Sequence, residues 1–166
     1  MKQEIKQAFN KQGYSFLLPI QEKAIPQILA HKNLFIQAAT GSGKTLAYLL
    51  PALEIADAAS NDTQVLIITP TRELALQVSE VAKNIANDSK HHIVTVIGGL
   101  DIHKQENALR HRPTIIIGTP GRLMDLYSQK KIDLSHLLLC VVDEVDMVIS
   151  TGQRKETEYL LQHTDT

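Results

Sequence analysis

Short apolar runs recur along the chain, and longer stretches with helical spacing separate them. The runs rich in β-branched residues predict strands at residues 34–37, 65–69, 93–97, 114–118 and 137–142. The stretches between them predict helices at residues 45 to about 59, 73 to about 87, 102 to about 111 and 122 to about 129. Strands that are almost wholly apolar and alternate with helices are typical of an α/β fold, in which a parallel sheet carries helices on both faces.

Composition narrows the class of protein. The 166 residues are 43% hydrophobic, which suits one compact domain or part of a larger one. The longest aliphatic run, 137–142, is too short to span a bilayer, and residues 1–10 are polar and charged, so we expect a cytoplasmic protein that does not contact a membrane. The single cysteine, Cys140, excludes a disulfide within the chain and suits core packing. A net charge of -1 requires any nucleic-acid contact to be local, and the seven histidines show no metal-ligand spacing.

A phosphate-binding loop connects the first predicted strand to the first predicted helix. Its sequence is Ala-Ala-Thr-Gly-Ser-Gly-Lys-Thr, residues 38–45. Glycines let the backbone wrap a phosphate, the Lys44 ammonium can reach the outer phosphates, and the Thr45 hydroxyl can hold magnesium. We therefore predict a nucleoside triphosphate site at Ala39, Thr40, Gly41, Ser42, Gly43, Lys44 and Thr45.

Two acids follow the last predicted strand. Asp143 and Glu144 would lie beside the phosphate loop, because the carboxyl ends of parallel strands meet at one edge of the sheet. One carboxylate could hold magnesium there and the other could orient an attacking water. The alternative interpretation is that both acids only cap a short helix that begins near Val145.

Hydroxyl and guanidinium groups follow two further strands at the same edge. Thr71-Arg72 and the segment from Thr119 to Arg122 each combine them with a helix start, which suits contacts with a phosphodiester backbone that read no bases. The backbone at Gly98-Gly99 could be approached closely by such a ligand. Each segment taken singly could also be an ordinary helix cap with a surface arginine.

These motifs, in this order, resemble the amino-terminal RecA-like domain of DEAD-box ATP-dependent RNA helicases over almost the whole chain. The segment Gly13-Tyr-Ser-Phe-Leu-Leu-Pro-Ile-Gln21 is similar to the adenine-recognition segment of that family. The resemblance implies ATP and Mg²⁺ as cofactors, with Gln21 at the adenine, Lys44 and Thr45 at phosphates and magnesium, Asp143 at magnesium through water, and Glu144 activating water. It implies RNA backbone contacts from Thr71, Arg72, Gly99, Thr119 and Arg122, and coupling between domains through Asp146.

Three departures from the family pattern change the expectation. Leu17-Leu18 replaces a Pro-Thr pair, so the hydroxyl that could cap the helix at Pro19 is missing, and we expect looser adenine recognition. Val145 replaces an alanine, and the acids on both sides of it are kept. The Ser-Ala-Thr segment of the family and its second RecA-like domain do not occur in these 166 residues.

The third departure predicts a gap in the sheet. In related domains the strand before the Ser-Ala-Thr segment lies between the phosphate-loop strand and the Asp-Glu strand, so its absence would expose unpaired backbone and apolar surface. We therefore expect residues 1–166 to be an incomplete helicase domain that does not unwind RNA alone. The alternatives are a DNA-directed helicase or translocase core, and a nucleotide-dependent module that binds RNA or protein without turnover.

Overall fold

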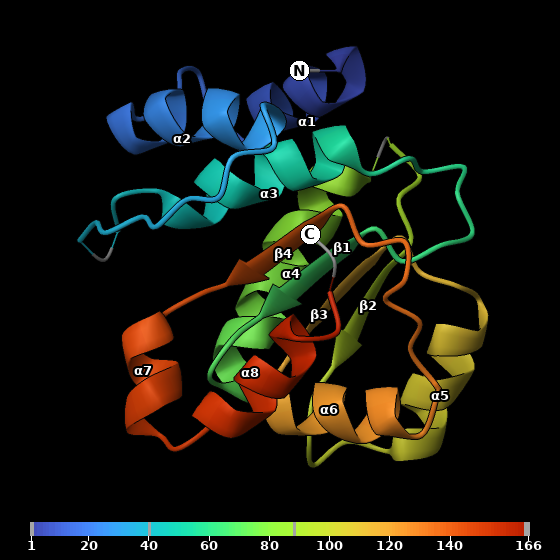
Figure 1. The fold of residues 1–166 in the computed structure, drawn as a ribbon. Helices are drawn as coiled ribbons and strands as arrows, with labels where there is room; N and C mark the ends of the chain where they lie inside the picture. Colours follow the sequence, from blue (N-terminus) through green and yellow to red (C-terminus); the bar gives the residue numbers. More distant parts are fainter. Residues whose placement is uncertain (1, 40, 88, 165–166) are drawn as a thin grey trace.

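A parallel four-stranded sheet forms the centre of the computed structural model, which describes residues 2–39, 41–87 and 89–164 (Figure 1). The strands are β1 (Val65–Ile68), β2 (Ile93–Val96), β3 (Ile115–Gly118) and β4 (Leu139–Val142), in the spatial order β2-β3-β1-β4. Ile67 of β1 pairs with Ile117 of β3 on one side and with Val141 of β4 on the other. The prediction of an α/β fold with a parallel sheet is confirmed.

Helices cover both faces of this sheet. They are α1 (Gln3–Lys11), α2 (Pro19–Leu29), α3 (Lys44–Ile55), α4 (Arg72–Ala86), α5 (Ile102–Arg110), α6 (Pro120–Ser128), α7 (Val145–Ser150) and α8 (Arg154–Leu161). In Figure 1, α4 lies behind the sheet, and α6 and α8 lie in front of it. Each of the four helices predicted from the sequence is present, within a few residues of its predicted bounds.

The two faces of the sheet build two separate hydrophobic cores. Successive strand residues point to opposite faces, so Ile67 packs with α1 to α4 while its neighbours Leu66 and Ile68 pack with α5, α6 and α8. All four residues of β1 and of β3 are buried, as expected for strands covered on both sides. This burial holds fixed the loops that follow β1 and β3.

The predicted strand at residues 34–37 is wrong, because this segment pairs with none of the four strands. The side chain of Phe35 is 83% exposed and that of Leu34 is 38% exposed, while Ile36 packs partly against the core. β4 pairs with β1 along one edge, and no described residue pairs with its other edge. An apolar run forms a strand only where a neighbouring strand offers hydrogen bonds, and none of the four strands offers them to this segment.

Because all four strands are parallel, their carboxyl ends lie on one side of the molecule and their amino ends on the other, and we call these sides the carboxyl edge and the amino edge. Residues that follow the strands lie at the carboxyl edge, and residues that precede them lie at the amino edge. α8 is held at the carboxyl edge, where the Gln153 amide just ahead of it donates a 2.8 Å hydrogen bond to the Pro70 carbonyl after β1. Among the described residues, no helix has the length and hydrophobicity needed to cross a membrane.

Candidate functional site

The phosphate loop folds back onto its own lysine. Lys44 is the first residue of α3, and its ammonium donates hydrogen bonds to the carbonyls of Ala38 and Ala39, the second at 3.1 Å. The Ser42 hydroxyl in the same loop is buried and lacks a hydrogen-bond partner among the described residues. An orphaned hydroxyl beside a helix N-terminus suits an anion that brings its own acceptor oxygens. The predicted site residue Thr40 lies outside the described residues.

Gln21 joins the start of α2 to the phosphate loop. Its carbonyl accepts a 2.9 Å hydrogen bond from the Leu18 backbone, and its amide donates at 3.1 Å to the Gly43 carbonyl. Leu18 provides no side-chain cap, as its sequence predicts, so Gln21 caps the helix in its place. Gly43 has φ 90°, and a Cβ there would lie 2.6 Å from the Gln21 amide nitrogen. A glycine is therefore required for this contact.

Asp143 is the best-anchored acid of the site. Its side chain is 9% exposed; Oδ2 accepts a 2.7 Å hydrogen bond from the Tyr48 hydroxyl, and Oδ1 accepts one at 2.9 Å from the Glu144 backbone. Burial, and then the negative charge of Asp143, raise the pKa of Tyr48 far above its ordinary value, with a smaller opposing effect from the Thr45 hydroxyl. The Tyr48 hydroxyl therefore keeps its proton and donates a hydrogen bond to Asp143, one of the predicted magnesium ligands.

Glu144 occupies a strained backbone position directly after β4. Its φ of 47° lies in the left-handed region, which is uncommon for residues other than glycine. It precedes α7, yet its side chain makes no capping hydrogen bond, which counts against a role as a mere helix cap. The carboxylate is half-buried, whereas Asp146 is exposed on the first turn of α7. Strain of this kind is often found at functional sites.

A hollow of about 640 Å³ lies at the carboxyl edge, among the loops that follow β1, β2 and β3. Residues from three of the predicted segments line it and so converge as expected: Thr71, Arg72, Gly98, Thr119, Gly121 and Arg122. Arg72 lies against the backbone of the glycine pair: a Cβ built on Gly99, at φ +77°, would come 2.1 Å from its Nη1. A larger residue at this position would displace the guanidinium.

The polar groups of this hollow differ in what they already bind. The Thr71 hydroxyl accepts a 3.1 Å hydrogen bond from the Leu74 backbone and so caps α4, whereas the Thr119 side chain makes no such bond at the start of α6. Arg122 Nη1 and Glu156 Oε2 are both buried without a hydrogen-bond partner among the described residues. A guanidinium with unmet donors is suited to an anionic ligand.

The structure adds three residues to those proposed from the sequence. Tyr48, Gln153 and Glu156 reach the carboxyl edge from α3 and from α8 with the turn ahead of it. Tyr48 could have been found by its spacing, because it lies three residues after Thr45 and so on the same face of the helix. Nothing in the sequence marks the other two, which reach the hollow only through the packing of α8 on α6.

Comparison with known proteins agrees with this arrangement. The family model described as DEAD/DEAH box helicase matches residues 18–166. The chain is 40% identical over 162 residues to the ATP-dependent RNA helicase CshA of Listeria monocytogenes, covering 98% of the chain and 31% of the relative. It is 37% identical over 163 residues to DEAD-box ATP-dependent RNA helicase CshA of Bacillus subtilis, covering 98% and 33%. The chain thus spans about a third of the length of these relatives.

Solved structures give the same result. A hypothetical ATP-dependent RNA helicase from Sulfolobus tokodaii superposes with a TM-score of 0.91 at 36% identity, covering 99% of this chain and 47% of the other. A DEAD box protein from the hyperthermophile Methanococcus jannaschii gives 0.94 at 31% identity, covering 99% and 45%. The family match over residues 18–166 and these likenesses confirm the resemblance found in the motifs, and the chain belongs to the DEAD/DEAH box helicase family.

Proposed function

We propose that this chain is the ATP- and RNA-binding half of an ATP-dependent RNA helicase. The observation that carries the proposal is the Tyr48–Asp143 hydrogen bond, because it ties the phosphate-loop helix to the acidic pair at the end of β4. The RNA-binding hollow that we propose opens at the same edge of the sheet. Both ligands would therefore meet one rigid surface.

The residues at the phosphate loop fit ATP and Mg²⁺. The Ser42 hydroxyl has no partner among the described residues, and the Lys44 ammonium is held by carbonyls that phosphate oxygens could replace. Oxygen donors from Thr45 and Asp143 suit Mg²⁺, which would neutralise charge on the phosphates when bound. Glu144 would orient water toward the outer phosphate. These residues supply positioning and charge, which account for most of catalysis in phosphoryl transfer.

In this proposal, adenine selectivity depends on an exchange of hydrogen bonds by the Gln21 side chain. Both polar ends of its side chain are engaged, and only 1% of the residue is exposed. Adenine binding would exchange the amide bond to Gly43 for one to the base. We expect Gln21→Ala to weaken ATP binding more than GTP binding, and equal weakening of both would contradict an adenine role.

RNA would bind along the hollow through its backbone. Arg72 and Arg122 supply guanidinium groups there, and Thr119 supplies an uncommitted hydroxyl at a helix start. Gly99 lets the backbone approach closely, while Thr71 fixes the start of α4. Contacts of this kind hold a phosphodiester chain in place without reading its sequence.

Unwinding or remodelling of RNA would be a property of a larger protein. Since the chain spans about a third of its curated relatives, we propose a second RecA-like domain as its partner, with Asp146 coupling hydrolysis to domain closure. A second domain in this class contributes an arginine finger worth about 10³ to 10⁵ in rate. The isolated chain should therefore bind nucleotide weakly and leave duplexes intact. A cytoplasmic location is part of the proposal.

Binding measurements test the proposal on the chain itself. A fluorescent ATP analogue should bind in the presence of Mg²⁺, and Lys44→Ala should abolish binding without changing thermal stability. Single-stranded RNA should bind, with Arg72→Gln and Arg122→Gln each reducing affinity. Equal preference for single-stranded DNA would favour a DNA-directed translocase. RNA binding that ignores both arginine substitutions would contradict the interface.

A further inference from the structure

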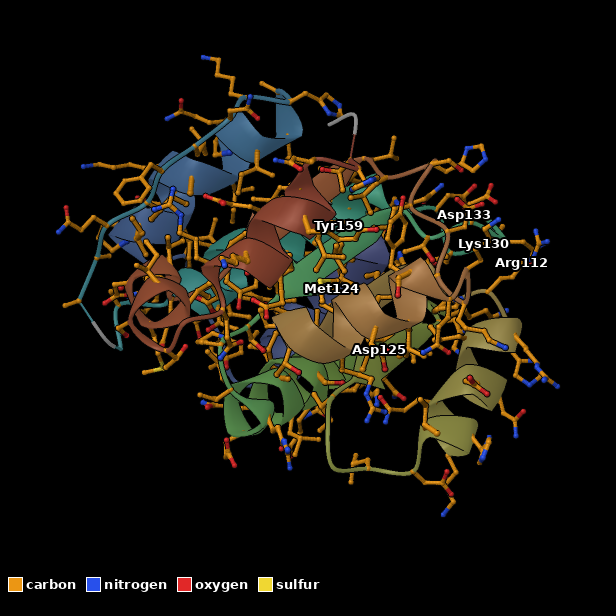
Figure 2. The ribbon with its side chains drawn as sticks, turned by 60° about the horizontal axis from the view of Figure 1, so that its bottom comes forward. Arg112, Met124, Asp125, Lys130, Asp133 and Tyr159 are labelled. Atoms are coloured by element: carbon orange, nitrogen blue, oxygen red, sulfur yellow. The ribbon has the colours of Figure 1, made fainter. Side chains whose placement is uncertain are left out.

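A basic hollow of about 190 Å³ lies at the amino edge of the sheet, opposite the nucleotide and RNA edge. We define the basic hollow by its five basic lining residues, Arg110, Arg112, Lys130, Lys131 and His136. Figure 2 shows Arg112, Lys130 and Asp133 gathered at one end of the molecule, with Asp125 nearer the middle of α6. A chain with a net charge of -1 thus concentrates positive charge at a second place.

The parallel sheet brings these residues together from loops far apart in sequence. Arg110 ends α5, and Arg112 leads into β3. Lys130 and Lys131 follow α6, and His136 precedes β4. Each pair of cations lies at a helix C-terminus, where the backbone amide of Arg112 donates to the Leu109 carbonyl at 2.9 Å and that of Lys130 to the Tyr127 carbonyl at 2.9 Å. The two helix ends are built alike and face one hollow.

Two of the cations occupy strained backbone positions. Arg112 has φ 48° and Lys130 has φ 58°, in the left-handed region where glycine is the usual residue after a helix. Cationic side chains near a helix C-terminus are also favoured by the partial negative charge of the last carbonyl groups. The same backbone geometry occurs after α2 at His31, with φ 55°, so it fixes where the Arg112 and Lys130 side chains start and does not itself identify a ligand.

Two acids, Asp62 and Asp133, also line the hollow, and they neutralise only part of the charge of its two arginines and two lysines. Asp133 Oδ1 is already bound by the Ser135 backbone at 3.0 Å and hydroxyl at 2.7 Å, which are the main reason that the pKa of Asp133 is lowered, with smaller effects from His136 and Arg112. Lys131 approaches Glu106 at 3.8 Å. Arg110, Arg112 and Lys130 form no ion pair with any described residue.

Size and position indicate the kind of anion. A volume of about 190 Å³ is smaller than the roughly 300 to 1,000 Å³ of sites that enclose whole small ligands, so the hollow suits one or two phosphate groups of a longer molecule. The first turn of α6 lines the proposed RNA hollow with Gly121 and Arg122, and the helix ends beside the basic hollow. Its nine residues span about 13 Å at 1.5 Å each, a distance that a folded or duplex RNA segment can bridge.

We propose that the basic hollow binds the phosphate backbone of a structured segment flanking the single strand held at the carboxyl edge. This inference rests on the proposed RNA-binding function and extends it to a second contact. The basic hollow would bind phosphate groups of the duplex that adjoins the single strand. The chain would therefore favour RNA in which single-stranded and double-stranded parts meet. Phosphate contacts position such a segment without reading its sequence.

The test compares two RNA probes by fluorescence anisotropy over a range of salt concentrations. One probe is single-stranded oligouridine, and the other is the same oligouridine joined to a hairpin. The test variant is Arg112→Gln/Lys130→Gln. The control is Lys6→Gln/Lys83→Gln, which removes two exposed cations from α1 and α4, on the opposite face of the sheet. Circular dichroism confirms that each variant is folded.

The wild-type chain should bind the hairpin probe more tightly than oligouridine and with a steeper salt dependence. Two phosphate contacts at about 0.9 each predict a slope difference of about 1.8, or about 10-fold in relative affinity between roughly 50 and 200 mM salt. Arg112→Gln/Lys130→Gln should lose this difference and bind oligouridine as before, while the control keeps both.

Other outcomes separate the inference from the function on which it rests. Equal hairpin binding by the test variant and the wild type would overturn the inference alone. If neither the wild type nor any variant bound oligouridine, the proposed function would be overturned instead. The same would follow if Arg72→Gln left the affinity for oligouridine unchanged. Oligoglutamate that binds as tightly as the hairpin, and is lost with Arg112→Gln/Lys130→Gln, would assign the hollow to an acidic protein partner and overturn the RNA proposal.

Discussion

Replacing Tyr48 by phenylalanine isolates the hydrogen bond that ties α3 to the acidic pair. The substitution keeps the buried ring and removes the hydroxyl that donates to Asp143 Oδ2 at 2.7 Å. Asp143 is buried, so water would not readily replace the lost donor, and the carboxylate would keep only the backbone bond from Glu144. A hydrogen bond to a charged group contributes about 1.5 to 3 kcal/mol. We expect the free energy of unfolding to fall by that amount.

Urea and thermal unfolding measure this loss. In a domain of this size each kcal/mol corresponds to about 2 to 4 °C, so the melting temperature should fall by roughly 3 to 12 °C. Tyr127→Phe is the matched control, because its hydroxyl forms no hydrogen bond with any described residue and its ring packs against Tyr159 and His163. That variant should stay within about 0.5 kcal/mol of the wild type.

High pH supplies an independent readout of the same bond. The pKa of Tyr48 is raised in the folded chain, mainly by burial, so its stabilising effect is complete below the unfolded-state value of 10.0. Above that pH the unfolded chain releases the phenolic proton and the folded chain keeps it, so the stability difference between wild type and Tyr48→Phe should shrink by about 1.4 kcal/mol per pH unit. Equal stability of the two proteins at neutral pH, or a constant difference above pH 10, would refute the reasoning.

Further predictions concern the hollow, the loops and the single thiol. Gly99→Ala should lower the free energy of unfolding by about 1 to 2 kcal/mol, because φ is +77° and the new Cβ would meet Arg72; single-stranded RNA affinity should fall with it, while Gly121→Ala, which has open space, should not destabilise the fold. Burial lowers the pKa of His91, so stability should decrease as pH falls below about 6.5, and His91→Gln should flatten that slope in urea titrations. Cys140 is half-buried in β4, and desolvation raises the pKa of its thiol to about 12, so it should react with a thiol reagent at neutral pH much more slowly than free cysteine; labelling of the folded chain as fast as free cysteine would contradict the raised pKa.

The sequence reveals the strands that are buried on both faces, because short apolar runs rich in β-branched residues, such as 65–69 and 114–118, favour strands over helices. It misleads at 34–37, where the local pattern is that of a strand but no partner strand is available. α1 was not predicted, although Ile5, Ala8 and Phe9 form a buried stripe at helical spacing. Because all the other residues of that segment are polar, the pattern is that of an amphipathic surface helix, and the sequence could have predicted α1.

Prediction of the site follows the same division. The phosphate loop could be found because its motif is contiguous and directly precedes a helix, and Asp143 and Glu144 could be found because they directly follow β4. The spacing of Tyr48 from Thr45 could have placed it on the same face of α3, but its hydrogen bond to Asp143 could be seen only in the structure. The basic hollow could not be predicted, because its cations come from separate loops that meet only when the strands align in parallel.

The most direct test of the central claim is the ATPase rate of a protein that carries this chain together with a second RecA-like domain. We predict strong stimulation by single-stranded RNA, lost in Glu144→Gln and in Lys44→Ala at matched salt. ATP turnover that RNA does not stimulate, or Mg-ATP binding through Lys44 with no turnover at all, would contradict the helicase account and favour a nucleotide-dependent binding module.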